Sequence, residues 1–173
     1  MGVFGGGISL VNSYDRERAV AYAMKWWDRH NPDFPVFSVD CTNYVSQCLF
    51  AGGGKMRGQP NRDIGWWSTK TNWSYSWSVA HSLYWYLRSS TEVLQGELVQ
   101  DVKELYEGDV ICYDFEGNSR FDHTTIVVSK DQTGMPLVNA HTDNSVLRNW
   151  EYRDSAAYTA NINYAFFRIS VNN

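Results

Sequence analysis

The hydrophobic periodicity of the chain changes near its middle, and this change constrains the fold more than any other feature. Small and apolar residues recur at a helical spacing over 14–30 and again over 40–54, where they form one stripe. A third helix is predicted over about 77–88. The second half instead contains four segments with the character of strands: 110–115, 123–129, 136–142 and 164–170. Helices followed by strands predict an α+β domain whose N-terminal helices pack on an antiparallel β-sheet.

The length of 173 residues suits one domain with one well-packed core. Residues 1–12 lack the cationic and apolar regions of a signal peptide, so we expect a flexible leader or expression remnant there and a single domain over 13–173. The apolar runs are too short for a membrane-spanning helix, and a net charge of −4 gives no reason to expect a nucleic-acid partner. We expect a monomer with no membrane span and no nucleic acid bound.

Three cysteines, with no C-x-x-C pair, argue against a disulfide framework or a structural zinc knuckle. Asp40 is a candidate N-cap of the second predicted helix, which puts Cys41 in the first helical turn. Unpaired backbone N–H groups and the positive end of the helix dipole favour a thiolate there. Cys48 lies further along the same stripe and Cys112 in the middle of a strand, where buried and inert thiols are expected. Cys41 is therefore the candidate nucleophile.

Two histidines fall on neighbouring predicted strands. His123 begins one strand, and Asn139 and His141 share a face of the next, because strand side chains alternate with period two. A turn at 131–134 would bring the start of the first strand near the end of the second, so we expect His123 and His141 to lie close together. A thiol, a base and a polar orienting group then form the arrangement of a cysteine hydrolase. The structural alternative for His123 is a strand-end histidine held by Asp122.

A long loop rich in tryptophan is predicted over 55–76. Loops of this length are uncommon unless they are functional. Aromatic side chains in and just after the loop are candidates for a substrate groove, with core packing as the alternative. The candidates are Trp66, Trp67, Trp73 and Trp77.

Several blocks of the sequence, in this order, also resemble a known family. The blocks are YDRERAVAYAMKWWDRHNPDFP, DCTNYVSQCLFAGG, YSWSV, EGDVICYD, DHTTIVV and NAHTDN. They are similar to the putative amidase domain of bacterial proteins, which is grouped with NlpC/P60 and CHAP enzymes in the papain-like cysteine peptidase and amidase superfamily. The resemblance spans roughly residues 14–168. One departure is Ser38-Val39, where the family pattern suggests smaller, glycine-like residues beside the cleft.

This resemblance implies a papain-like, NlpC/P60-like fold and assigns roles to three residues. Cys41 matches the nucleophile of the D-C-S-G block of NlpC/P60 enzymes, and His123 matches the base histidine that begins a strand. His141, in an H-T-x-D pattern, matches the third polar residue on the next strand, and Asn139 is the alternative. No cofactor is implied.

The resemblance also implies hydrolysis of an amide bond through a thioester intermediate. The implied substrate is bacterial cell-wall peptidoglycan or a peptide, cut as by an N-acetylmuramoyl-L-alanine amidase or an endopeptidase, outside the cell or in the cell wall. One alternative is a catalytically inactive module of the same fold that binds the cell wall or a carbohydrate. Another is a zinc hydrolase, although the sequence contains no H-E-x-x-H motif. Its ligands would be His123, His141 and Asp122 or Asp143.

Overall fold

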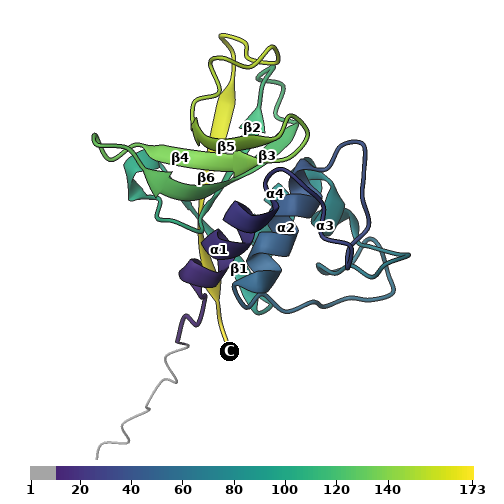
Figure 1. Ribbon diagram of the computed structural model, residues 1–173. Coiled ribbons are helices and arrows are strands. Elements are labelled where there is room, and N and C mark those ends of the chain that lie inside the picture. Colours follow the sequence, from purple (N-terminus) through teal and green to yellow (C-terminus); the bar gives the residue numbers. More distant parts are fainter. Residues whose placement is uncertain (1–10) are drawn as a thin grey trace, which may run out of the picture.

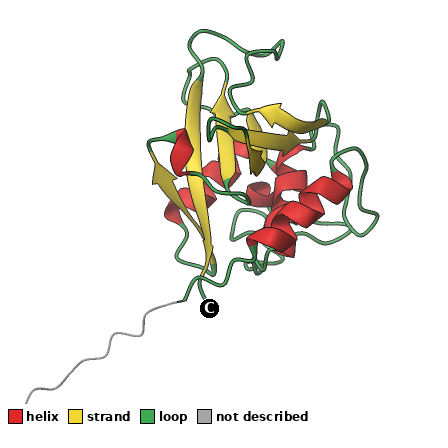
Figure 2. Ribbon diagram, turned by 60° about the vertical axis from the view of Figure 1, so that its left-hand side comes forward, coloured by secondary structure: helices red, strands yellow, loops and turns green. Residues whose placement is uncertain are grey.

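The computed structural model describes residues 11–173 as helices packed on one face of a single sheet (Figures 1 and 2). The helices are α1 (Arg16–Trp26), α2 (Cys41–Ala51), α3 (Tyr75–Ser78) and α4 (Ala80–Ser89), with a 3-10 turn at Val102–Glu104. The strands are β1 (Leu94–Val99), β2 (Val110–Asp114), β3 (His123–Lys130), β4 (Pro136–Ala140), β5 (Ser145–Asn149) and β6 (Asn163–Val171). They lie in the order β1-β6-β2-β3-β4-β5, and each neighbouring pair is antiparallel. The predicted α+β class is confirmed.

Most of the predicted leader, residues 1–10, lies outside the described residues. Asn12, its last residue, forms an antiparallel bridge with Asn172 and accepts the backbone N–H of Val171 through its side-chain oxygen at 3.0 Å. Ordered contacts with the sheet therefore begin one residue before the expected start of the domain.

The first two helices begin where the sequence predicts. Asp15 caps α1 by accepting a backbone N–H three residues further on, at 3.0 Å. Helix α2 begins at Cys41, directly after Asp40. Helix α1 ends at Trp26, earlier than predicted, and residues 27–29 form a turn. Within 11–173, no helix has both the length and the apolar character needed to cross a membrane.

The third predicted helix is two separate helices, α3 and α4. They are divided at Val79, whose φ of −122° and ψ of 126° belong to an extended chain. The preceding loop is held by backbone pairing, because isolated β-bridges join Arg57 to Trp66 and Ser68 to Trp73. The loop therefore folds back on itself before α3 begins.

The two edge strands, β1 and β5, are absent from the sequence prediction. Each is only partly buried, so neither contains a sustained apolar run. In β1, Gly96 allows the strand to approach the helix layer, because an added Cβ would come within 2.8 Å of the Phe167 ring and 2.9 Å of Leu87. The glycine interrupts the alternation of apolar residues by which a strand is predicted, and it also makes the close packing possible.

Each face of the sheet has its own apolar cluster. The larger cluster joins the helices to one face, where Cys48 of α2 and Cys112 of β2 are fully buried, as predicted. Burial raises the pKa of both thiols well above the ordinary value. The smaller cluster covers the other face and includes Tyr113 of β2 and Tyr152 from the segment after β5. The start of β3 lies between these two environments.

Candidate active site

Cys41 lies where the start of α2 meets the start of β3. Its surface is only 2% exposed. The sulfur lies 3.7 Å from the Thr42 hydroxyl, and the backbone of Thr124 in β3 also donates towards it. Burial raises the pKa of the Cys41 thiol, and these hydrogen bonds oppose the rise only in part. The protonated thiol is therefore the resting form at neutral pH.

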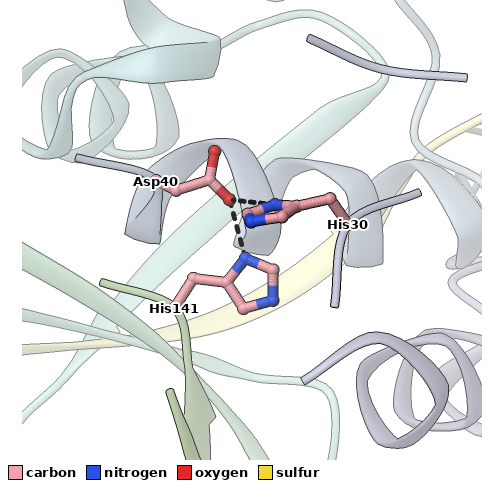
Figure 3. Close-up of side chains that lie close together, drawn as sticks. All are labelled: His30, Asp40 and His141. Atoms are coloured by element: carbon pink, nitrogen blue, oxygen red, sulfur yellow. Dashed lines mark hydrogen bonds and ion pairs between the residues drawn. The ribbon is translucent and has the colours of Figure 1, made fainter. Parts of the chain in front are cut away.

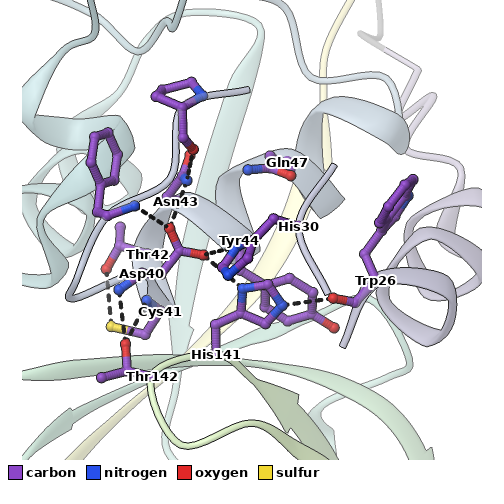
Figure 4. Close-up of polar contacts among 12 residues, drawn as sticks. Trp26, His30, Asp40, Cys41, Thr42, Asn43, Tyr44, Gln47, His141 and Thr142 are labelled. Atoms are coloured by element: carbon purple, nitrogen blue, oxygen red, sulfur yellow. Dashed lines mark hydrogen bonds and ion pairs between the residues drawn. The ribbon is translucent and has the colours of Figure 1, made fainter. Parts of the chain in front are cut away.

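The turn after β4 holds the start of α2. Thr142 Oγ1 accepts the backbone N–H of Asp40 at 2.8 Å and that of Cys41 at 3.1 Å (Figure 4). Thr142 and Asp143 have φ values of 68° and 107°, in the left-handed region that side chains other than glycine enter at a cost. A strained turn thus aims one hydroxyl at two N–H groups that a helix start leaves unpaired.

Asp40 precedes α2, yet its carboxylate makes no capping hydrogen bond to the helix. Its Oδ2 lies 2.6 Å from His141 Nδ1, and its Oδ1 accepts from the Phe37 backbone at 3.1 Å and the Asn43 amide at 2.9 Å (Figure 4). The other ring nitrogen of His141, Nε2, lies 2.6 Å from the carbonyl oxygen of Trp26. This buried network ties the residue before the thiol to three surrounding segments.

His123, the first residue of β3, lies among aromatic side chains. Its ring centroid is 5.5 Å from that of Tyr113, 6.0 Å from Phe115 and 5.0 Å from Tyr152. Its Nε2 is 3.0 Å from the Tyr152 hydroxyl. Burial, and then the positive charge of Arg148, lowers the pKa of His123 to about 3. The ring is therefore uncharged at neutral pH, and in this environment it is a weaker base than an ordinary imidazole.

His123 and His141 lie at the same end of the sheet but on opposite faces. His123 pairs with Tyr113 of β2 and points to the aromatic cluster. Asn139 pairs with Ile126, which belongs to the core beneath the helices, so alternation places His141 on that face too. The His141 ring stacks on Tyr44 of α2, with centroids 4.1 Å apart. The expected proximity along the strands is present, but the sheet separates the two side chains.

Neither sequence candidate for the orienting role bonds to His123. His141 bonds to Asp40, while Asn139 accepts the backbone N–H of Leu147 at 2.9 Å and donates towards α1. Tyr152 is the side chain that bonds to the imidazole. No periodic signal marks Tyr152 in the sequence, because it lies in an irregular segment and has a φ of 60°.

A cleft with a volume of about 490 Å³ opens beside the thiol, and Cys41 contributes to its wall. Ser38 and Val39, where the sequence departs from the family pattern, also line it. The remaining wall carries both aromatic and cationic side chains, among them Phe37, Trp73, Tyr75, Arg62 and Arg120. His123 instead lines a smaller cavity of about 110 Å³, together with Thr142, Arg148 and Tyr152. The candidate nucleophile and base thus border two neighbouring hollows.

Only one of the four predicted groove tryptophans lines this cleft. Trp73 does so, whereas Trp66, Trp67 and Trp77 are fully buried. The indole of Trp77 donates to the Asn43 side chain at 2.8 Å, and that of Trp66 donates to the Ser46 hydroxyl at 3.1 Å. The Trp66 and Trp77 rings therefore pack against α2. For the three buried tryptophans the alternative of core packing applies.

The zinc ligand set considered from the sequence is not gathered. His123 and His141 face opposite sides of the sheet, Asp122 lines the cleft, and Asp143 lies 3.8 Å from the guanidinium of Arg148. The side chains within 11–173 that do converge with metal-ligand spacing are His30, Asp40 and His141.

Comparison with known proteins finds a family match over most of the described residues. The family model described as a putative amidase domain matches residues 13–167. An uncharacterised protein of Bacillus subtilis (strain 168), YhbB, is 58% identical over 156 residues, which cover 90% of this chain and 50% of that protein. The chain therefore spans about half the length of this curated relative. No solved structure matches. The chain belongs to the putative amidase domain family.

Proposed function

We propose that this domain is a papain-like cysteine hydrolase that cleaves an amide bond, with Cys41 as nucleophile and His123 as base. The observation that carries the proposal is the position of Cys41, at the first residue of a helix and in the wall of an open cleft. A helix start favours the negative charge that a reacting thiolate develops. Membership of an amidase family supports the choice of bond.

The geometry around the thiol supports His123 as the base. Thr124, the residue after His123, donates its backbone N–H towards the Cys41 sulfur. Tyr152 bonds to the imidazole, and its pKa is raised to about 12 by burial, with the nearby Cys41 a lesser contributor. The Cys41 sulfur thus lies against the residue that follows His123 in β3. On substrate binding the ring exchanges Tyr152 for the thiol, because catalytic hydrogen bonds often tighten only in the complex.

The proposed reaction has two steps. The thiol proton passes to His123, the thiolate of Cys41 attacks the amide carbonyl carbon, and the imidazolium protonates the leaving amine. Water then hydrolyses the thioester with His123 as general base. The backbone N–H groups of Asp40 and Cys41, which now donate to Thr142, would stabilise the oxyanion. His141 contributes by fixing Asp40, and Asn139 by its packing against α1.

Peptidoglycan or a wall-derived peptide is the proposed substrate, and a site outside the cell or in the cell wall follows from it. This choice rests on the resemblance to NlpC/P60 and CHAP enzymes. The side chains that line the cleft are compatible with a peptide substrate. Arg62 and Arg120 suit its carboxylates, and Trp73 offers an apolar face. The proposal does not specify whether the bond lies within the stem peptide or between the glycan and the peptide.

The test is turnover of purified peptidoglycan and soluble muropeptides, with products identified by mass spectrometry. Cys41→Ser and His123→Ala should each reduce turnover by about 10³-fold or more, as is usual when a member of such a unit is lost. Cys48→Ala and Cys112→Ala are matched controls, since both thiols are buried away from the cleft, and they should retain activity. Full turnover in folded Cys41→Ser would overturn the proposal.

A catalytically inactive wall- or carbohydrate-binding module is the second candidate. The buried, protonated state of Cys41 and the bond from Tyr152 to His123 favour it. Alkylation by iodoacetamide at neutral pH separates the two, with labelled sites mapped by mass spectrometry. Labelling of Cys41 faster than a model thiol supports the enzyme, whereas slow labelling together with binding to intact cell walls supports the module.

A further inference from the structure

We infer that His30, Asp40 and His141 form a binding site for Zn²⁺ that is separate from the thiol chemistry. The imidazole rings of His30 and His141 both face one carboxylate oxygen of Asp40 (Figure 3). The three residues come from separate segments: the chain after α1, the residue before α2 and the turn after β4. Their donor atoms all lie within 4.8 Å of one another. The family resemblance assigns no such site, and the inference does not depend on the proposed hydrolysis.

The two distances from the carboxylate to the imidazole nitrogens lie on either side of the ligand spacing in a tetrahedral zinc site. Asp40 Oδ2 lies 3.5 Å from His30 Nδ1 and 2.6 Å from His141 Nδ1. Zinc bonds of about 2.0–2.1 Å separate tetrahedral ligand atoms by about 3.3 Å. The distance between Asp40 and His30 already suits the ion. The hydrogen-bonded distance between Asp40 and His141 must open by about 0.7 Å, as zinc replaces the proton between them.

The outer contacts of the buried ligands are those that metal sites use. His141 Nε2 is directed at the carbonyl oxygen of Trp26, which leaves Nδ1 facing the carboxylate. Asp40 Oδ1 is occupied by donors from Phe37 and Asn43, which leaves Oδ2 facing the two rings. Such contacts fix the tautomer of a ligating histidine and the orientation of a ligating carboxylate. The cluster is thus oriented inwards by its surroundings.

His30 supplies both a ligand and a path from solvent. Its side chain is 47% exposed, whereas those of Asp40 and His141 are each 4% exposed. Within 11–173 the His30 ring makes no hydrogen bond, and its only polar contact is with Asp40. The two imidazole rings meet edge to face, with centroids 5.2 Å apart. An ion can therefore enter past His30, with water in the fourth position.

The donor set favours a transition metal such as zinc over calcium or magnesium. Two imidazole nitrogens and one carboxylate suit zinc, whereas calcium and magnesium require oxygen ligands in larger number. The Cys41 sulfur is not among the converging atoms, although Cys41 directly follows Asp40. The site therefore differs spectroscopically from any adventitious site built on the thiol.

The experiment measures metal binding to the purified, chelator-treated chain by competition with a zinc indicator, and the absorption spectrum with Co²⁺. We expect one Zn²⁺ per chain, and a tetrahedral Co²⁺ spectrum without a thiolate charge-transfer band. His30→Gln should weaken Zn²⁺ binding at least 10-fold, because it removes one of three protein ligands. His81→Gln and Cys41→Ala are the controls and should bind as the unaltered chain does.

Because His30 is half exposed, His30→Gln should unfold at the same denaturant concentration as the unaltered chain, so weaker binding cannot come from misfolding. Equal affinity in His30→Gln, loss of binding in Cys41→Ala, or no binding by the folded chain would each overturn the inference. None of these measurements depends on turnover, so failure of the zinc site and failure of the proposed hydrolysis are distinguishable.

Discussion

His141 and His123 lie at the same end of the sheet, one on each face, and their surroundings differ in kind. On the face beneath the helices, His141 lies between a carboxylate and a carbonyl oxygen, which are both acceptors. On the other face, His123 lies among aromatic rings, and burial together with Arg148 lowers its pKa to about 3. The first environment holds a ring in place, and the second keeps a ring uncharged. A register shift of one residue between β3 and β4 thus separates an anchoring histidine from one that is held uncharged.

The largest effect should come from breaking the polar network of His141. Asp40→Ala leaves His141 buried without its carboxylate partner, which should reduce the free energy of unfolding by about 3–5 kcal/mol. Urea denaturation in the presence of a chelator measures the loss. Asp33→Ala, at an exposed carboxylate on the same connecting segment, is the control and should be near neutral. A loss below about 1 kcal/mol for Asp40→Ala would mean that the network does not anchor α2.

The aromatic surroundings of His123 should appear in the pH dependence of stability. Burial, assisted by Arg148, lowers the pKa of His123 from the usual 6.5 to about 3, so between these values the unfolded chain binds a proton that the folded chain does not. Stability should therefore fall as the pH drops below about 6.5, by at most about 1.4 kcal/mol per pH unit from this residue.

Urea unfolding at several pH values, for the unaltered chain and for His123→Gln, isolates this contribution, because the carboxylates titrate in both proteins. The advantage of the unaltered chain should shrink as the pH falls towards 5. If the free energies of unfolding of the two proteins changed equally with pH, the pKa of His123 would not be lowered by folding, and the proposed difference between His123 and His141 would be wrong.

A smaller effect is expected at the hydrogen bond that holds His123. Tyr152→Phe removes the hydroxyl 3.0 Å from Nε2 and should reduce the free energy of unfolding by about 1 kcal/mol. Combined with His123→Phe, the two losses should not add, because they remove the same bond. Tyr158→Phe is the control and should change little. Additive losses would show that Tyr152 acts through packing alone.

The smallest effect should follow removal of the cation beside this cluster. Arg148 lies 3.9 Å from the centre of the Tyr152 ring and helps to lower the pKa of His123. Arg148→Met should move that pKa upwards, towards its ordinary value, as followed by NMR titration of the imidazole. Arg153→Met, at an exposed arginine that pairs with Glu151, should leave the titration unchanged. An unchanged titration in Arg148→Met would leave burial as the only cause.

The sequence predicted the elements with strong periodicity and the residues that begin them. The start of α2 was accessible from Asp40, helix α1 from its helical spacing, and β2, β3, β4 and β6 from their apolar runs. The edge strands were not accessible, because half-exposed strands lack such runs. The break at Val79 was not either, because the residues on both sides have helical spacing.

Within the candidate site, the sequence indicated which residues gather but not how they pair. A regular hairpin with the register found next to the turn would place His123 and His141 on one face, but the register of β3 and β4 shifts by one residue between Val127 and Ser129. This irregularity puts the two histidines on opposite faces, and no sequence pattern marks it. The bond between Asp40 and His141 joins residues 101 positions apart, and no local pattern encodes it. The same applies to Tyr152 and to the burial of Trp66 and Trp77 behind α2.

The Thr142 hydroxyl has a consequence for how a substrate would be selected under the proposed mechanism. It already satisfies the backbone N–H groups of Asp40 and Cys41, so a carbonyl oxygen reaching them exchanges one acceptor for another. A neutral carbonyl gains little from this exchange, because it replaces a neutral hydroxyl of similar strength. An oxyanion gains more, since bonds to a charged acceptor are roughly twice as strong. The Thr142 hydroxyl would thus be displaced from these N–H groups by the oxyanion of the transition state but not readily by the neutral carbonyl of the bound substrate.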